Sequence, residues 1–239
     1  MPTQESEFDL KTPADSRRGA ADRYWGKARP SADSAGSAPC HLLVHHSLDV
    51  AAVAVEALRR LPALRRQFTS RLGLSNTQPA SWVGFWVALH DLGKFSEAFQ
   101  SQCPDVFIAL RHRASNPAKP YSLRHDSLGM LFWKDVLRDV TIDEAWFGPA
   151  SEDLADGFDW WARACTGHHG QPPTEGDFWA QHFDTHHDRD AALSFFREVQ
   201  RFFITADLTE AIAAQSPSDF LAASTELSWW LAGLTVLAD

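Results

Sequence analysis

The sequence predicts an all-α protein, and three observations support this fold class. From residue 42 onward, apolar side chains recur at spacings of three and four residues. No convincing run of alternating apolar and polar residues interrupts that pattern, so we expect no extended sheet. The chain has 239 residues with 10 Trp and 16 Phe, which is enough for one domain with a substantial core.

The beginning of the chain differs in composition from the remainder. The stretch ARPSADSAGSAPC is rich in Ser, Ala and Pro, which is typical of loosely ordered segments. We expect a loosely ordered arm over residues 1–40, in which Tyr24 and Trp25 pack locally, and one domain over residues 41–239. The polar, acidic start MPTQESEFDLKTP indicates no secretory signal. The apolar run WWLAGLTVLA near residue 239 is too short to span a bilayer.

Charge and cysteine content narrow the function classes. The net charge of −9 argues against a protein that simply coats nucleic acid. Residues 1–139 carry 18 Lys and Arg against 14 Asp and Glu, whereas residues 140–239 carry 4 against 17, so contact with a polyanion is expected from the first part. The acidic second part is either a solvated surface or a surface facing a partner. The three cysteines are widely spaced and odd in number, which indicates reduced thiols in a cytoplasmic protein.

The first helix is expected to begin near His46. The segment HSLDVAAVAVEALRRLPAL shows the spacing of an amphipathic helix. Its expected inward face consists of His46, Val50, Val53, Ala57 and Leu61. A histidine on this face is either a core residue with satisfied hydrogen bonds or a metal ligand.

The segment SWVGFWVALHDL is apolar nearly all round, which predicts a central buried helix. We expect Gly93 to end this helix in the left-handed conformation, so that His90 and Asp91 lie on its last turn. Neighbouring side chains on a helix diverge by about 100°. Both could therefore bind one ion, Asp91 could bridge two ions, or the pair could only form hydrogen bonds.

Two further histidine groups follow. The segment HDSLGMLFWKDVL predicts a helix that begins at His125 with Asp126 near its start. The segment DGFDWWARAC predicts another helix, followed by the loop TGHHGQPP with His168 and His169 between two glycines. Consecutive histidines in such a loop have no evident packing purpose, whereas His125 is also compatible with a core position.

The last helix, STELSWWLAGLTVLAD, is expected to place Asp239 on its apolar face, in line with Trp229, Ala232 and Val236. A buried carboxylate needs a partner. One binuclear metal site would explain the five separate features, which are His46, the pair His90-Asp91, His125, the pair His168-His169, and Asp239.

Other polar motifs have weaker interpretations. His-Asp also occurs at 125–126 and 187–188, and about one such pair is expected by chance, so the dipeptide alone indicates little. His182 and His186 have a metal-compatible spacing, but their polar neighbours in HFDTHHD predict a solvated connection at the surface. Lys94 would either hold a scissile phosphate or neutralise a helix end. The basic loop over residues 111–125 would be a track for a phosphate backbone or an ordinary solvated loop.

The ordered motifs HSLDVAAVA, ALHDLGKFSEAFQ, RHDSLG, TGHHGQPP and LAGLTVLAD resemble the HD nuclease domain of the CRISPR-associated helicase–nuclease of type I systems. The resemblance covers residues 24–239 and implies an all-helical HD bundle with two divalent transition-metal ions. The family is associated with iron, manganese, nickel or cobalt. The implied ligands of one ion are His46, His90, Asp91 and Asp239, and those of the other are Asp91, His125, His168 and His169. Lys94 matches the lysine that follows the His-Asp pair in the family, and the implied catalytic residues are Asp91 and Lys94.

The resemblance also implies a function. Members of the family cut single-stranded DNA by metal-activated attack of water, after a guide-RNA surveillance complex has recruited a helicase portion. The family usually continues beyond the position of residue 239 into that helicase portion, which we expect here in cis or in trans. We expect a cytoplasmic monomer without membrane association. Two alternatives stay open: an HD phosphohydrolase acting on nucleotides, and a non-catalytic helical docking module.

Overall fold

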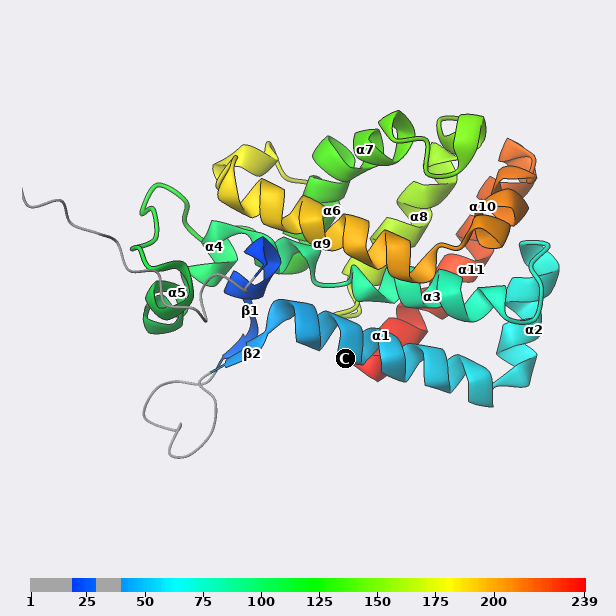
Figure 1. Cartoon of the computed structure of the whole chain (residues 1–239), viewed down its shortest axis with the longest axis horizontal. Coiled ribbons are helices and arrows are strands. Elements are labelled where there is room, and N and C mark those ends of the chain that lie inside the picture. The colour runs from blue at the N-terminus through cyan, green and yellow to red at the C-terminus, as the bar shows by residue number, and fades with distance from the viewer. Residues whose placement is uncertain (1–18, 29–39) are drawn as a thin grey trace, which may run out of the picture.

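The computed structural model describes residues 19–28 and 40–239, which form a bundle of helices with one short hairpin (Figure 1). This confirms the predicted all-α fold class. The elements, with η for 3-10 turns and for one π-helical turn (η5), are η2 (Ala20–Arg23), β1 (Trp25–Ala28), β2 (Cys40–Leu42), α1 (Leu43–Arg60), α2 (Pro62–Arg71), α3 (Gln78–Ala88), η4 (Leu92–Phe95), α4 (Glu97–Gln100), α5 (Pro104–Arg111), α6 (His125–Phe132), η5 (Trp133–Leu137), α7 (Arg138–Asp143), η6 (Gly148–Ser151), α8 (Ala155–Thr166), η7 (Trp179–Gln181), α9 (His187–Phe203), α10 (Ala206–Ala213) and α11 (Pro217–Ala238).

Helix α3 lies at the centre of the bundle, between α1 and α9, as Figure 1 shows. Its tryptophans pack against aromatic rings from other helices: Trp82 lies 5.4 Å from Trp161 and Trp86 lies 5.3 Å from Trp133, between ring centroids. Such edge-on pairs contribute about 0.5–1.5 kcal/mol each beyond the burial of apolar area. The prediction of a central buried helix is confirmed, and the rigid core fixes the end of α3.

The hairpin includes part of the segment that the sequence predicts to be an arm. Strands β1 and β2 pair antiparallel, with Trp25 opposite Leu42. Tyr24 and Trp25 are 1% and 7% exposed, so this stretch is packed into the domain. The rest of the expected arm, residues 1–18 and 29–39, lies outside the described residues, and the domain boundary at residue 40 stays a prediction.

Helix α1 turns a slightly different face inward than its apolar pattern predicts. His46 and Val50 are buried as expected, but Val53 and Leu61 are 51% and 47% exposed. The observed face continues through Ala54 and Leu58, so the prediction is wrong for the second half of the helix. A shift of one residue rotates a side chain by about 100°, so the buried face passes through Ala54 instead of Val53.

Helix α11 is long and apolar enough to cross a membrane by length and composition, because it extends back to Pro217 beyond the run considered above. In the structure, 44% of the residues in its most apolar window are buried inside the domain. It packs on α8, where Trp161 Nε1 donates a hydrogen bond to Ser224 Oγ at 2.8 Å.

Asp239 follows α11 and reaches the site from a different face of that helix than the one predicted. The main-chain N–H of Asp239 donates to Thr235, which is fully buried. Trp229 and Val236, which the pattern aligned with Asp239, are 77% and 50% exposed. That alignment was wrong, because the buried stripe of α11 runs through Leu227, Leu231 and Thr235 instead.

Candidate metal centre

His90 and Asp91 lie in the turn that follows α3, and they are 0% and 1% exposed. Gly93 does not have a positive φ, so the predicted left-handed helix end is wrong; the chain continues directly into η4. The glycine is required for another reason, because a Cβ at Gly93 would lie 1.9 Å from the carbonyl oxygen of His125. This close approach brings Asp91 next to the start of α6.

One half of the candidate site, called here the first half, faces Oδ2 of Asp91. His46 Nε2 lies 3.1 Å and His90 Nε2 lies 3.2 Å from this oxygen. Asp239 Oδ1 lies 3.1 Å from His46 Nε2 and 4.0 Å from His90 Nε2. The end of α3, the start of α1 and the end of α11 therefore converge on one point.

The second half faces the other oxygen of Asp91. His125 Nε2 lies 3.5 Å and His168 Nε2 lies 3.6 Å from Asp91 Oδ1. His169 completes this group, because its Nε2 lies 2.8 Å from His125 Nε2. The structure therefore brings together all seven residues that the sequence singled out, with Asp91 between two groups of imidazoles.

Main-chain carbonyl groups orient two of these imidazoles. His90 Nδ1 lies 2.8 Å from the carbonyl oxygen of Val87, and His168 Nδ1 lies 3.2 Å from that of Cys165. A carbonyl oxygen only accepts, so each Nδ1 carries the proton and donates it. The lone pair of each Nε2 then faces the cluster, which is the arrangement typical of histidines that bind metals.

Five buried atoms of the cluster have no hydrogen-bond partner. They are His46 Nε2, His90 Nε2, His168 Nε2, Asp91 Oδ1 and Asp91 Oδ2. Buried polar atoms are normally satisfied. Of these five, only Asp91 Oδ2 has a cation nearby, the ammonium group of Lys94 at 2.6 Å, so the other four are costly without a further cation. A set of neutral imidazoles with carboxylates suits a divalent transition metal better than magnesium or calcium. The residues present therefore fit the ions that the resemblance implies.

Two histidines of the second half, His125 and His168, are in the form that metal binding requires. Burial lowers the pKa of His125 to about 3 and the pKa of His168 to about 4, although the Asp91 carboxylate opposes both shifts. Both rings are therefore neutral at physiological pH, with an unprotonated nitrogen available to an ion.

The carboxylates are ionised. Burial alone would raise the pKa of Asp91, but the imidazoles of His90 and His46 and the ammonium group of Lys94 hold it well below its usual value. The contact with His46 likewise holds the pKa of Asp239 far below its usual range. Burial opposes protonation of His46, yet its two carboxylate neighbours outweigh that effect and raise its pKa.

Lys94 lies inside the centre rather than on its rim. It is 7% exposed, and its Nζ lies 2.6 Å from Asp91 Oδ2. Its ammonium group also lies 5.5 Å from the centroid of the Phe99 ring. Lys94 is thus placed to balance the charge of Asp91.

The motif HFDTHHD is not the solvated connection that its composition predicts. His186 and His187 are exposed, but His182 is 7% and Asp188 is 0% exposed. The carboxylate of Asp188 accepts hydrogen bonds from Tyr24 OH, Glu97 N, Asp184 N and Arg111 Nη2. The prediction was wrong because these donors come mostly from distant segments, which the local composition does not reveal.

The basic side chains of the loop over residues 111–125 form more contacts within the domain than the sequence indicates. The Arg111 side chain is 5% exposed and pairs with Asp188 at 3.0 Å. Arg113 donates to both carboxylate oxygens of Glu97 at 2.8 Å, and Lys119 donates to the carbonyl oxygen of Ala180. Much of its charge therefore stabilises the fold beside α6 rather than facing solvent.

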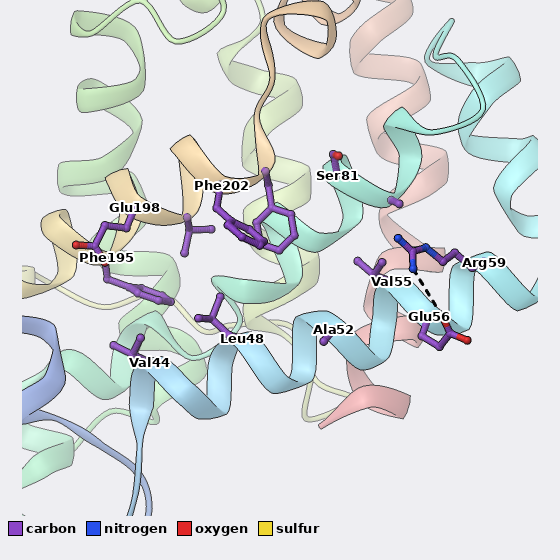
Figure 2. Close-up of a pocket in the computed structure, with 13 residues that line it drawn as sticks. Val44, Leu48, Ala52, Val55, Glu56, Arg59, Ser81, Phe195, Glu198 and Phe202 are labelled. Atoms are coloured by element: carbon purple, nitrogen blue, oxygen red, sulfur yellow. Dashed lines mark ion pairs between the residues drawn. The ribbon is translucent and has the colours of Figure 1, made fainter.

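A separate groove of about 640 Å³ lies between α1, α3 and α9 (Figure 2). Its lining is mainly apolar and includes Leu48, Val55, Phe195 and Phe202, with one ion pair between Glu56 and Arg59. None of the seven clustered residues lines this groove. The candidate metal centre and this groove are distinct features.

The chain is similar to known proteins of one family. The family model described as "Cas3, HD domain" matches residues 25–239. The CRISPR-associated endonuclease/helicase Cas3 of Escherichia coli is 32% identical over 161 residues, covering 62% of this chain and 17% of that protein. The protein of the same description from Thermus thermophilus is 31% identical over 140 residues, covering 56% and 14%. The chain thus spans less than a fifth of either relative.

Solved structures share the fold. The crystal structure of T. fusca Cas3 with ADP has a TM-score of 0.59 at 22% identity, covering 91% of this chain and 22% of that one. A chain from a CRISPR RNA-guided surveillance complex in a pre-nicking state has a TM-score of 0.58 at 20% identity, covering 87% and 28%. The family model extends from Trp25 in β1 to Asp239 in the first half of the centre. The chain therefore belongs to the Cas3 HD-domain family.

Proposed function

We propose that this chain is a metal-dependent nuclease that cleaves single-stranded DNA in type I CRISPR interference. Its reaction is hydrolysis of a phosphodiester bond, which makes it a hydrolase. The single observation that carries this proposal is Asp91, whose two buried oxygens face separate groups of imidazoles.

In this proposal the first half holds one divalent ion and the second half holds another, with Asp91 shared between them. Iron, manganese, nickel and cobalt all suit the imidazole-rich set. When bound, such a pair of ions supplies a nucleophilic water at neutral pH and stabilises charge on a phosphate. The protein contributes a rigid, buried frame, because the end of α3 is fixed by the aromatic core.

The side chains have distinct roles. The neutral rings of His125 and His168 offer lone pairs without a competing proton, as their lowered pKa values of about 3 and 4 require. Lys94 holds Oδ2 of Asp91 and limits the negative charge of the centre. A DNA strand would approach from the side where His169 and Asp239 are partly exposed.

The test is cleavage of single-stranded DNA with added Mn²⁺ or Co²⁺ under reducing conditions. Asp91→Ala should abolish cutting while far-UV circular dichroism stays that of a folded protein. Asp153→Ala, which changes an exposed aspartate, is the matched control and should cut normally. Undiminished cutting by Asp91→Ala would refute the site. Release of phosphate from nucleotides without DNA cutting would replace this proposal by the phosphohydrolase alternative.

We further propose that a helicase portion, in cis or in trans, packs on the outer face of α11. This face exposes Trp229 (77%), Trp230 (52%) and Leu237 (82%), and relatives are several times longer than this chain. Large apolar side chains exposed along one helix favour an interaction surface there. Changing Trp229 and Leu237 to Ser should weaken association with the helicase portion and leave cutting of free single-stranded DNA unchanged. Equal association would refute this placement.

The proposed setting is the cytoplasm, with recruitment through a guide-RNA surveillance complex and with the chain itself a monomer. The described cysteines Cys40, Cys103 and Cys165 are free thiols, which suits a reducing compartment. Sedimentation of the purified chain tests the monomer, since a stable dimer at micromolar concentration would contradict it.

A further inference from the structure

Asp239 and His169 are the two exposed residues among the seven of the cluster. Asp91 is buried on all sides, and the rings of His90 and His168 are held by carbonyl oxygens. Asp239 follows the last turn of α11, and its side chain is 20% exposed. A carboxylate in that position can rotate toward water, so its orientation depends on whatever else contacts it.

Lys27 on strand β1 makes that contact. Its Nζ lies 3.1 Å from Asp239 Oδ1 and 3.3 Å from the main-chain oxygen of the same residue. Oδ1 is also the oxygen that faces His46 at 3.1 Å. Lys27 therefore restrains both ends of Asp239 and keeps the oxygen nearest the imidazoles turned into the first half.

Strand β1 is itself fixed against the centre. A Cβ at Gly26 would lie 3.1 Å from the Cβ of His46 and from the Cα of Leu43, so glycine leaves room for the close approach of the strand to α1. The neighbouring peptide is held by the fully buried side chain of Gln100, which accepts from Trp25 N at 3.1 Å and donates to Trp25 O at 2.8 Å. Gln100 also donates to the carbonyl oxygen of Lys94 at 2.7 Å.

We propose that Lys27 is a positioning residue of the metal centre, which acts through Asp239 and is presented by the hairpin. Hydrogen-bond partners of ligating carboxylates orient the ligand, and their loss typically weakens metal binding about 10- to 100-fold. This inference rests on the proposed metal centre. The Trp25–Gly26–Lys27 strand then helps to hold the ion of the first half and has no part in holding the ion of the second half.

The experiment is an equilibrium titration of the 239-residue chain with Mn²⁺, followed by electron paramagnetic resonance of the free ion. Lys27→Met should weaken binding of one ion about tenfold or more and leave the other unchanged. Lys27→Arg, which keeps a cationic donor, should restore most of the affinity. Lys134→Met, at an exposed lysine on η5, is the matched control and should bind as the unaltered chain does.

A double-mutant cycle separates positioning from a general structural effect. In an Asp239→Asn background, Lys27→Met should cause no further loss of Mn²⁺ affinity, because Lys27 acts through the Asp239 carboxylate that this background lacks. A loss as large as in the unaltered background, or an unchanged affinity in Lys27→Met alone, would overturn the inference. Failure of the unaltered chain to bind Mn²⁺ would overturn the proposed metal centre itself, so the two failures are distinguishable.

Discussion

Two buried aspartates that follow a histidine in this chain have opposite surroundings. The carboxylate of Asp188 accepts four hydrogen bonds, one of them from the buried guanidinium of Arg111. Asp91 is as deeply buried, yet its oxygens form no hydrogen bond, and they face histidine nitrogens and the ammonium group of Lys94. The dipeptide is the same in both places, so it is the partners that distinguish a structural aspartate from a candidate metal ligand.

This comparison predicts separate consequences for the two aspartates. Removing the charge of Asp91 should affect metal binding more than folding, since both halves of the centre face this carboxylate and no main-chain donor loses a partner. Removing the charge of Asp188 should affect folding far more than metal binding, since it weakens four hydrogen bonds at once and leaves a buried guanidinium without its counter-charge.

The largest effect is expected for Asp91→Asn. Both halves of the centre share this carboxylate, so the number of bound Mn²⁺ ions should fall from two to none. Metal analysis after gel filtration measures the count. Retention of one tightly bound ion would show that Asp91 does not bridge the halves.

Single histidine changes should each remove one ion. His46→Ala disrupts only the first half and His168→Ala only the second, so each variant should retain about one Mn²⁺ per chain. His45→Ala, at the exposed neighbour of His46, serves as the control. Loss of both ions in either variant would argue for a single shared site.

Asp188→Asn should destabilise the fold by about 3–5 kcal/mol, because the guanidinium of Arg111 stays buried without its counter-charge. Urea unfolding measures this difference, and Asp190→Asn at an exposed neighbouring position provides the reference. Binding of the second ion should be unchanged. A stability loss below about 1 kcal/mol would place Asp188 among ordinary exposed pairs.

The smallest effect is a difference in pH dependence between the two halves. The raised pKa of His46 means that it retains its proton at a pH where an ordinary histidine has lost it. His125 and His168, with pKa values of about 3 and 4, stay unprotonated from neutral pH down to mildly acidic pH. As the pH falls through this range, binding of the first ion should weaken before binding of the second. Mn²⁺ titrations at several pH values test this order.

The sequence was sufficient for the helix that leads to the pair. The apolar run of α3 predicted a buried helix, which is confirmed, and His90 and Asp91 are buried, although they lie in the turn after Ala88 rather than on the last helical turn as predicted. It was misleading where burial depends on contacts between distant segments. Donors to Asp188 lie as far as 164 residues away at Tyr24, and no local pattern encodes that proximity.

The same limit applies to the supports of the centre. Composition predicted a loosely ordered arm around Lys27, although glycine next to a tryptophan and a lysine was a signal of close packing. The face of Asp239 was assigned from large apolar neighbours such as Trp229, which instead lie at the surface. Apolar periodicity locates helices well, but it cannot distinguish a core face from an exposed apolar face.

The contact between Lys27 and Asp239 joins residues 212 positions apart. During synthesis, every proposed ligand of the second ion has left the ribosome once residue 169 has emerged. The first half is complete only after Asp239, its last residue in the sequence, has been added. A nascent or truncated chain therefore carries an incomplete centre, so the order of translation itself delays the proposed DNA-cutting activity until the whole domain has been made.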